Sequence, residues 1–422
     1  MRGLHFARLA LAIGAIVALA SCGGSQPPNG APGAMPQTGA IARPPSSAYR
    51  VLHRFQEPPN VGGDNQVAPL LDVSGRLYGT TEYGGSNHNG LVYRISTRGA
   101  ERLLYRFGGG SGDGINPTAG LVDVNGTLYG TTLRGGNEDC GTVYSISKSG
   151  EEKVIYNFRG AHGDFDGRAP WAPLIDVDGT LYGTTRSGGY TNGIVYRVST
   201  EGAEKVLYRF SEGVYGGQIP TGGLVDVNGT LYGTTRRGGV GPCKNGGCGT
   251  VYRISQSGVE KEVYRFRGGS SDGANPHAGL IDVNGRLYGT TFLGGLQRCN
   301  KGCGIVYSVT ARGKEEVLYD FGGAPNDGLH PSGGLLDVNG TLYGTTAYGG
   351  TGKSCGRKGC GTIYSVSTLG VEQVLHSFAG GFDGAHPKAN LIDVNGTLYG
   401  TTTYVQNRNG GTGSGTVFAL TP

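Results

Sequence analysis

The residues best suited to bind a ligand stand two positions after a Thr-Thr pair that the chain repeats. Three of them are tyrosines in the stretches "TTEYGG", "TTAYGG" and "TTTYVQ", namely Tyr83, Tyr348 and Tyr404. Two are arginines in "TTLRGG" and "TTRRGG", namely Arg134 and Arg237. Aromatic rings stack on sugar rings and pack against extended peptides, so this set predicts a site for a glycan or a protein segment. The alternative is that each tyrosine covers the glycines of its own loop.

The only tryptophan, Trp171, is expected in a loop of the same face and joins this predicted site. Non-repeated polar residues that could catalyse a reaction are few: His88, Glu138, Asp139, His162 and Asp164. None belongs to a spacing such as G-x-S-x-G or H-E-x-x-H, and no cofactor motif appears. The residues therefore favour a non-enzymatic binding or scaffold module without a cofactor. Two alternatives stay open: an extracytoplasmic hydrolase, lyase or lactonase with an unrecognised site, and a purely structural envelope protein.

Three loops of the repeat contain a pair of cysteines each. The pairs are Cys243 with Cys248, Cys299 with Cys303, and Cys355 with Cys360. Short-range pairs in an exported chain predict disulfides that stiffen the loop, with a zinc site built from two neighbouring pairs as the alternative. Cys140 occupies the same position as Cys248 but has no partner in its loop. We therefore expect an unpaired thiol there.

Three histidines lie beside a proline that recurs along the chain, namely His277, His330 and His386. Imidazole groups are common zinc ligands, yet no cysteine or carboxylate completes a ligand set near them. No bound metal is therefore expected.

The first residues read as an export signal with an anchor. Arg2 and Arg8 precede an apolar run that is too short to span a bilayer, and "LASC" resembles a bacterial lipobox. The resemblance implies a signal peptide at residues 1–21, a lipidated Cys22 and attachment to a membrane of the bacterial cell envelope. Residues 22–48 are rich in Gly, Pro and Ser, so they predict a flexible tether.

The rest of the chain repeats one phrase, "VNGTLYGTT" in the copy at residues 124–132. The tyrosines of its seven versions are 51, 53, 50, 56, 55 and 56 residues apart, a period typical of propellers. One unit, residues 119–158, divides into four short strand-like segments: "GLVDV", "TLYGTT", "GTVYSIS" and "EKVIYNF". The Asn-Gly between the first two is a strong hairpin signal. Each unit therefore predicts one four-stranded antiparallel blade, with strands a to d.

The two ends of the repeat array predict how the ring closes. The last unit stops after its third strand, whereas residues 49–55 match an isolated fourth strand before the first unit. Pairing these two ends would remove two open sheet edges. The sequence therefore predicts an all-β fold, a seven-bladed β-propeller over residues 49–422 with an N-terminal outer strand. In such a ring the loops between strands b and c and between strands d and a share one face, where we expect the binding site.

Most tyrosines and many aspartates belong to the repeat itself. The repeated tyrosines are expected to pack between blades, with each hydroxyl reaching a partner or water. An aspartate stands two residues before every hairpin turn, at Asp72, Asp123, Asp176, Asp226, Asp282, Asp337 and Asp393. A carboxylate there can accept backbone N–H bonds of the turn, so we expect a structural role rather than acid–base catalysis.

The charges are mixed along the chain, with a net charge of +5 and no long basic run, so nucleic acid is not expected as a partner. The pattern "DVNGTLYGTT…GG…GTVY…G…E…VLYRF" resembles the GloVer tandem repeat of bacterial surface proteins. This resemblance implies a propeller and a place at the cell surface, and it assigns no activity.

Overall fold

A computed structural model describes these residues: 48–55, 63–108, 110–160, 166–188, 192–211, 216–239, 241, 243, 246–296, 298–406 and 412–422. Side chains of residues 64, 404–406, 412 and 413 are not part of that description. The predicted signal peptide, Cys22 and the tether up to residue 47 lie outside the described residues, as do His162 and Asp164. All described strands belong to one compact unit, Pro45–Pro422.

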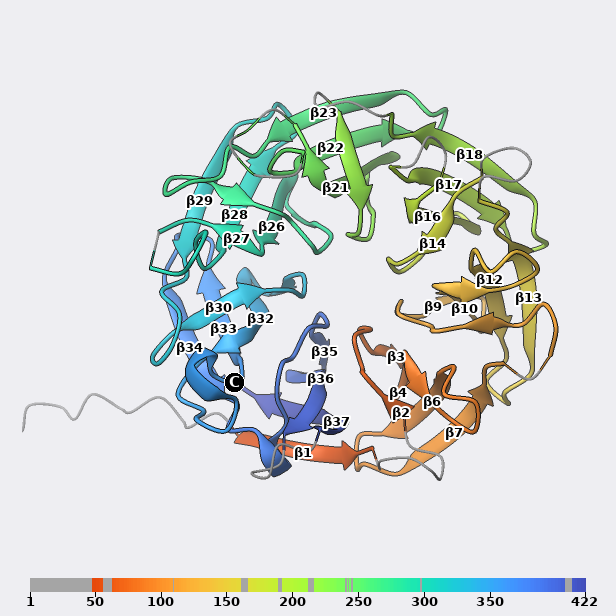
Figure 1. The fold of residues 1–422 in the computed structure, drawn as a ribbon, viewed down its shortest axis with the longest axis horizontal. Coiled ribbons are helices and arrows are strands. Elements are labelled where there is room, and N and C mark those ends of the chain that lie inside the picture. The colour runs from red at the N-terminus through yellow and green to blue at the C-terminus, as the bar shows by residue number, and fades with distance from the viewer. Residues whose placement is uncertain are drawn as a thin grey trace, which may run out of the picture. The chain divides into compact units, whose positions relative to one another are not determined.

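Most of the described strands form seven antiparallel sheets, which we number as blades one to seven (Figure 1). Strands a lie nearest the ring axis: β3 (Leu71–Val73), β9 (Val122–Val124), β15 (Ile175–Val177), β20 (Val225–Val227), β25 (Ile281–Val283), β31 (Leu336–Val338) and β35 (Ile392–Val394). Strands b follow: β4 (Arg76–Thr81), β10 (Thr127–Thr132), β16 (Thr180–Ser187), β21 (Thr230–Gly238), β26 (Arg286–Thr291), β32 (Thr341–Gly349) and β36 (Thr397–Gln406).

The outer half of each blade consists of strands c and d. Strands c are β6 (Leu91–Ser96), β12 (Thr142–Ile146), β17 (Ile194–Ser199), β22 (Thr250–Ser255), β28 (Ile305–Thr310), β33 (Thr362–Ser367) and β37 (Thr412–Thr421). Strands d form the rim: β7 (Glu101–Arg106), β13 (Glu152–Asn157), β18 (Glu204–Arg209), β23 (Glu260–Arg265), β29 (Glu315–Asp320), β34 (Glu372–Ser377) and β1 (Ala48–Arg54). The predicted seven-bladed propeller is confirmed.

The predicted closure is also confirmed. β1 pairs antiparallel with β37, from Ala48 opposite Thr421 to Arg54 opposite Thr416. The first described strand of the chain therefore completes the last blade, and in Figure 1 it lies at the rim beside β37.

Blades one to six carry short additional pairings that the sequence did not indicate. Three are separate pairs, β2 (Gly63–Asp64) with β5 (Tyr83–Gly84), β8 (Gly114–Ile115) with β11 (Arg134–Gly135), and β24 (Gly273–Ala274) with β27 (Leu293–Gly294). Elsewhere a longer strand b pairs with β14 (Arg168–Pro170), β19 (Gly217–Pro220) or β30 (Gly328–Pro331). Segments this short and glycine-rich show no hydrophobic period. Each pairing joins the d–a loop of a blade to the residues after its Thr-Thr pair.

The hairpin between strands a and b forms as the sequence predicts. Asn125 and Gly126 have φ of 53° and 87°, the left-handed conformation that a two-residue type I′ turn requires. The backbone N–H of Gly126 donates to Asp123 Oδ1 at 2.7 Å. The repeated aspartate of strand a therefore stabilises the turn, which confirms its structural role in this blade.

Aromatic side chains pack where one blade meets the next. Phe158, at the end of strand d in blade two, contacts Tyr196 of blade three edge to face, with the ring centroids 5.0 Å apart. Tyr196 lies across Gly183, where a Cβ atom would come within 2.6 Å of the tyrosine oxygen. The glycine of "LYG" is thus needed for this close approach.

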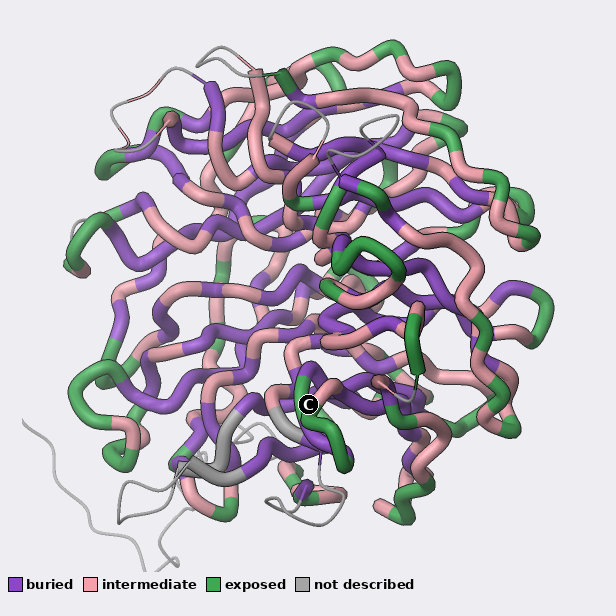
Figure 2. Tube along the Cα trace, turned by 45° about the vertical axis from the view of Figure 1, so that its right-hand side comes forward, coloured by how far each residue is buried: buried purple, intermediate pink, exposed green. Residues whose placement is uncertain are grey.

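The tyrosine hydroxyls of strands c and d differ. In strand d they reach an aspartate as expected, for example from Tyr264 to Asp272 at 2.9 Å. In blades one to six the strand c hydroxyl has no hydrogen-bond partner within the described structure, and Phe418 takes the place in blade seven. These rings therefore contribute packing rather than hydrogen bonds. Figure 2 shows the resulting pattern, with buried residues along the strands and exposed residues mainly in the turns.

Within the described residues the helices are two single 3-10 turns, η1 (Gly356–Lys358) and η2 (Gly381–Asp383). No helix in this part of the chain is both long and apolar enough to cross a membrane.

Candidate functional site

A cavity of about 360 Å³ opens on the face formed by the b–c and d–a loops. Its wall is supplied by blades one, three, four, five, six and seven, so the cavity lies on the ring axis. A second space of about 280 Å³ shares Val67, Trp171, Thr221, His277, Ser332 and Lys388 with the first. The two spaces are therefore consecutive parts of one channel, and we refer to the first as the axial cavity.

Two positions of the repeat build most of this wall. The first directly follows the Thr-Thr pair and is, in chain order, Glu82, Leu133, Arg186, Arg236, Phe292, Ala347 and Thr403. The second follows the recurring proline, or Gln66 in blade one, and is Val67, Thr118, Trp171, Thr221, His277, Ser332 and Lys388. All of them except Leu133, Thr403 and Thr118 line the axial cavity, and Thr118 lines the second space.

The backbone explains why the position after the proline reaches the axis. The residue before the proline is left-handed in every blade: Asn65, Asn116, Ala169, Ile219, Asn275, His330 and His386, with φ between 54° and 60°. Asparagine tolerates this conformation, whereas the β-branched Ile219 is strained in it. Strain of this kind is typical of places where the chain is held in position for a function.

The structure brings only two of the sequence-predicted residues to this wall. Trp171 and Tyr348 line the axial cavity. Tyr83 is 42% exposed and belongs to β5, which pairs with β2. Arg134 forms an exposed ion pair with Asp139 at 3.0 Å, and Arg237 pairs with Gln218 across β21 and β19. The side chain of Tyr404 lies outside the described part, and a ligand role for any of these residues stays a prediction.

The residues that sequence reasoning missed lie one position earlier. Strand b continues beyond the Thr-Thr pair, and neighbouring residues of a strand point to opposite sides. The position directly after the pair lines the axial cavity in five blades, whereas among the described side chains the next position does so only at Tyr348. The sequence does contain a signal for this position. It holds Glu, Leu, Arg, Arg, Phe, Ala and Thr in the seven repeats, although the Thr-Thr pair before it never changes.

One side of the axial cavity is aromatic. Phe292 stacks on His277 and on His330, with centroid distances of 4.5 and 4.3 Å. Tyr348 follows, with centroids 5.9 Å from His330 and 4.8 Å from His386. The two carbon rings separate the three histidines, and the described residues contain no group of three metal-ligating side chains. The histidines serve as flat packing surfaces.

Burial keeps these imidazoles neutral near pH 7. It lowers the pKa of His277 to about 3, with a further contribution from Arg236, and the pKa of His330 to about 4. His277 Nε2 and both ring nitrogens of His330 have no hydrogen-bond partner among the described residues. His386 differs, because its Nδ1 hydrogen bonds to the Ala347 carbonyl at 2.7 Å.

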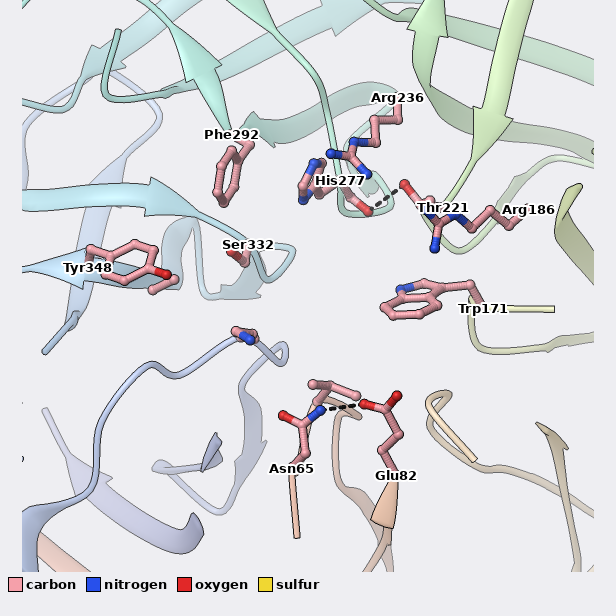
Figure 3. Close-up of a pocket in the computed structure, with 13 residues that line it drawn as sticks. Asn65, Glu82, Trp171, Arg186, Thr221, Arg236, His277, Phe292, Ser332 and Tyr348 are labelled. Carbon is pink, nitrogen blue, oxygen red and sulfur yellow. Dashed lines mark hydrogen bonds between the residues drawn. The ribbon is translucent and has the colours of Figure 1, made fainter. Parts of the chain in front are cut away.

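The remaining wall carries charge (Figure 3). Arg186 and Arg236 lie on one side, near Trp171 and Thr221. Glu82 lies on another side, is 7% exposed and accepts a hydrogen bond from Asn65 Nδ2. Burial lowers the pKa of Lys388, and the nearby Glu82 carboxylate opposes that change. The acidic side thus has basic and amide partners.

The disulfides are confirmed and fix the loops around this face. Cys243–Cys248, Cys299–Cys303 and Cys355–Cys360 are bonded, each with Cα atoms 5.2 Å apart, so the alternative zinc site is wrong. In blade four the sulfurs lie against Gly268 of the next d–a loop, where a Cβ would come within 2.9 Å of Cys243 Sγ. Disulfides persist in oxidising compartments, so the folded domain is an exported one.

Cys140 is an unpaired, buried thiol, as predicted. Its sulfur lies against Gly160 in the same way that the disulfides lie against their glycines. Burial raises the pKa of the Cys140 thiol, which makes it a weak nucleophile at neutral pH.

The fold and the cavity define a seven-bladed β-propeller with a polar and aromatic cavity at one end of its axis. The chain belongs to the Gloeobacter/Verrucomicrobia repeat family, which matches residues 33–246 and 242–422. This confirms the repeat family indicated by the sequence pattern. No curated protein sequence matches the chain.

Several solved structures are similar in fold only. One is a protein of unknown function from Bacteroides thetaiotaomicron VPI-5482, 14% identical, with 89% of this chain and 96% of that chain covered and a TM-score of 0.41. Another is PorZ, a surface component of the type-IX secretion system of Porphyromonas gingivalis. It is 14% identical, the match covers 86% of this chain and 47% of that chain, and the TM-score is 0.47. A third is a puromycin-hydrolyzing peptidase of Mycobacterium tuberculosis. It is 11% identical, the match covers 79% of this chain and 48% of that chain, and the TM-score is 0.47. Likenesses this distant carry no argument about activity.

Proposed function

We propose that this protein is a non-enzymatic binding module that holds the end of a glycan, or a short protein segment, in the axial cavity. The observation that carries the proposal is where the seven repeats differ. Strand residues repeat from blade to blade, whereas the two positions that line the cavity change in size and charge. A ring of identical blades cannot specify one ligand, so the differing residues are the ones that select it.

The chemistry of the wall favours a glycan. Trp171 offers a wide aromatic face beside polar groups, and Tyr348 lies across the cavity from it (Figure 3). Sugar rings stack on such faces while their hydroxyls hydrogen bond to neighbouring polar side chains. Thr221, Ser332 and Asn65 supply such groups.

Trp171 also makes the proposal easy to test, because it is the only tryptophan of the chain. Its fluorescence should change when a saccharide from a glycan panel occupies the cavity. Calorimetry should then show that Trp171→Ala weakens binding by at least about tenfold, the effect of losing a central aromatic contact. Tyr83→Ala is the matched control, since Tyr83 is exposed and lies outside the cavity wall. Binding that survives Trp171→Ala and is lost in Tyr83→Ala would place the site on the outer loops instead.

An enzyme is the second candidate, because the neutral His277 has an unpartnered Nε2 beside Arg236 in the same wall. A neutral imidazole can accept a proton, but a pKa of about 3 makes His277 a weak base, so this candidate ranks below binding. Following each bound saccharide for cleaved products over time decides between the two functions. Turnover that Trp171→Ala or His277→Gln abolishes would replace binding with catalysis.

We propose further that lipid at Cys22 anchors the module to the cell envelope. The support is the "LASC" sequence and the tether that follows it. The full-length protein should sediment with membranes, and Cys22→Ala should shift it to the soluble fraction. A Cys140→Ala variant is the control, because that thiol is buried in the propeller. Wild-type protein that is already soluble would contradict the anchor.

A further inference from the structure

Two of the three basic side chains that line the described wall of the axial cavity are gathered on one side, and the third, Lys388, lies near Glu82. Arg186 and Arg236 occupy the same repeat position in the neighbouring blades three and four, and both line the cavity. Figure 3 shows their side chains near Thr221, His277 and Trp171, away from the Asn65–Glu82 pair. Two guanidinium groups thus face one part of the opening.

In the described part of the chain, Arg186 and Arg236 lack partners of opposite charge, whereas Glu82 on the acidic side has the amide of Asn65 and the nearby Lys388. Among the described residues neither forms an ion pair with a carboxylate. Arg236 Nε is buried without a hydrogen-bond partner. Burial and the charges of Arg186 and Arg237 hold the pKa of Arg236 below its usual value. A half-buried cation without an anionic partner is stabilised when an anion pairs with it.

Neighbouring groups indicate what kind of anion fits. The Arg186 guanidinium lies over one face of the Trp171 ring, 5.7 Å from its centroid, so an oxyanion held by Arg186 would lie beside this ring, whose other face remains for stacking. Thr221 donates its hydroxyl to the His277 carbonyl at 3.3 Å, which joins the d–a loops of blades four and five in this wall. Guanidinium groups bind carboxylates through paired hydrogen bonds. A carboxylate attached to a sugar ring meets both features at once.

We infer that the ligand of the axial cavity is an acidic saccharide, with its carboxylate bound between Arg186 and Arg236 and its ring on Trp171. This inference rests on the proposed binding function and specifies its ligand class. Glu82 does not oppose it, because that carboxylate lies on another side of the cavity and is held by Asn65.

The experiment compares two saccharides that differ in charge. The full-length protein is titrated with trigalacturonate and, separately, with the neutral galactotriose, and Trp171 fluorescence is followed. We expect trigalacturonate to bind at least about tenfold more tightly, because one charge-assisted hydrogen bond changes an equilibrium constant by that much. Its affinity should fall as sodium chloride is added, since salt screens the interaction. Sodium acetate at the same anion concentration should compete only weakly.

Variants assign the effect to the two arginines. Arg186→Gln with Arg236→Gln should remove the preference for the acidic sugar, and thermal melting checks that the double variant is folded. Arg197→Gln is the matched control, because Arg197 lies in β17 of blade three and outside the cavity wall. It should bind trigalacturonate as the wild type does.

The outcomes separate the two proposals. Equal binding of the two saccharides, or a preference that survives the double substitution, overturns the acidic-ligand inference and leaves the binding function intact. Acetate that competes as well as trigalacturonate overturns the requirement for a sugar. If both saccharides leave the Trp171 fluorescence unchanged, that result counts against the binding function itself.

Discussion

A variant lacking residues 48–55 is expected to lose at least about 3–5 kcal/mol of unfolding free energy, the amount typical of truncating a single buried phenylalanine. Domains have a total of about 5–15 kcal/mol, so the loss is a large part of the whole. The direct reason is that β1 is the fourth strand of blade seven. Without it, β37 becomes an open sheet edge.

The side chains of residues 48–55 add to the loss of unfolding free energy that comes from the missing hydrogen bonds of β1. Tyr49 stacks on His376 of blade six with ring centroids 3.8 Å apart, and its hydroxyl donates to the Asp383 carbonyl at 2.8 Å. Phe55, just after β1, contacts Tyr93 of blade one with centroids 4.9 Å apart. Residues 48–55 therefore join blades six, seven and one.

Denaturant titration measures the effect. The deletion variant should unfold at a clearly lower denaturant concentration, and a synthetic peptide AYRVLHRF added in trans should restore part of the difference. A scrambled peptide should not, because it cannot place Tyr49 and Phe55. Arg50→Ala in the full chain is the matched control, since Arg50 is exposed and should change stability by less than about 1 kcal/mol. An unchanged midpoint in the deletion variant would show that the ring closes without this strand.

The sequence was sufficient for this closure and for the blade count, because both follow from counting repeats. Seven a-b-c units with seven d strands leave one arrangement without open edges. It was not sufficient for the short pairings such as β2 with β5, which depend on contacts between two loops distant in the chain. Glycine-rich pairs of residues give no local signal for them.

Of the residues that the sequence suggested for ligand binding, Trp171 and Tyr348 line the axial cavity, and whether any of them binds a ligand stays a prediction. Sequence reasoning chose Tyr83 and Arg237, whereas the wall contains Glu82 and Arg236. Which of two neighbours faces the axis depends on how far strand b continues beyond the Thr-Thr pair, and that is set by pairing with the d–a loop. The sequence could have indicated His277 and Lys388 as wall residues, because each follows the recurring proline at a position that changes between blades.

The propeller is expected to become more stable as the pH falls from about 8 to about 6.5. A glutamate begins strand d in blades two, three, five and six, at Glu152, Glu204, Glu315 and Glu372, and faces the preceding blade. In each of these the pKa is raised from 4.5 to about 7, first by burial and then by an aspartate of the d–a loop that leads into the same blade. One carboxyl oxygen of each is buried without a partner.

The sign follows from comparing folded and unfolded chains. A folded-state pKa above the unfolded value means that the folded state binds the proton more tightly, so stability is complete below pH 4.5 and is lost as the pH rises through 7. Linkage gives about 0.8 kcal/mol per carboxyl over the interval. Because these carboxyls are partly exposed, solvent screening reduces this, and we expect about 1–2 kcal/mol in total.

Two histidines limit the gain at lower pH. The pKa values of His277 and His330 are lowered from 6.5 to about 3 and about 4, so each favours the folded state above 6.5 and opposes it as the pH falls further. Their loss begins between pH 8 and 6.5, at about 0.4 kcal/mol per histidine, and grows below pH 6.5, so it subtracts from what the glutamates contribute. Stability should therefore rise on mild acidification and then level off or decline.

Denaturant midpoints at about pH 8 and about pH 6.5 check this directly. Replacing Glu152, Glu204, Glu315 and Glu372 together by Gln should raise the midpoint at the higher pH and flatten its pH dependence, because the amide carries no charge to bury. Glu151→Gln is the matched control, since Glu151 is adjacent to Glu152 but exposed. Stability that falls between the two pH values, or a slope that the fourfold substitution leaves intact, would mean that other groups govern the pH response. The repetition is what makes the effect measurable: one such carboxyl would change stability by less than 1 kcal/mol, but the ring repeats the arrangement at successive blade interfaces.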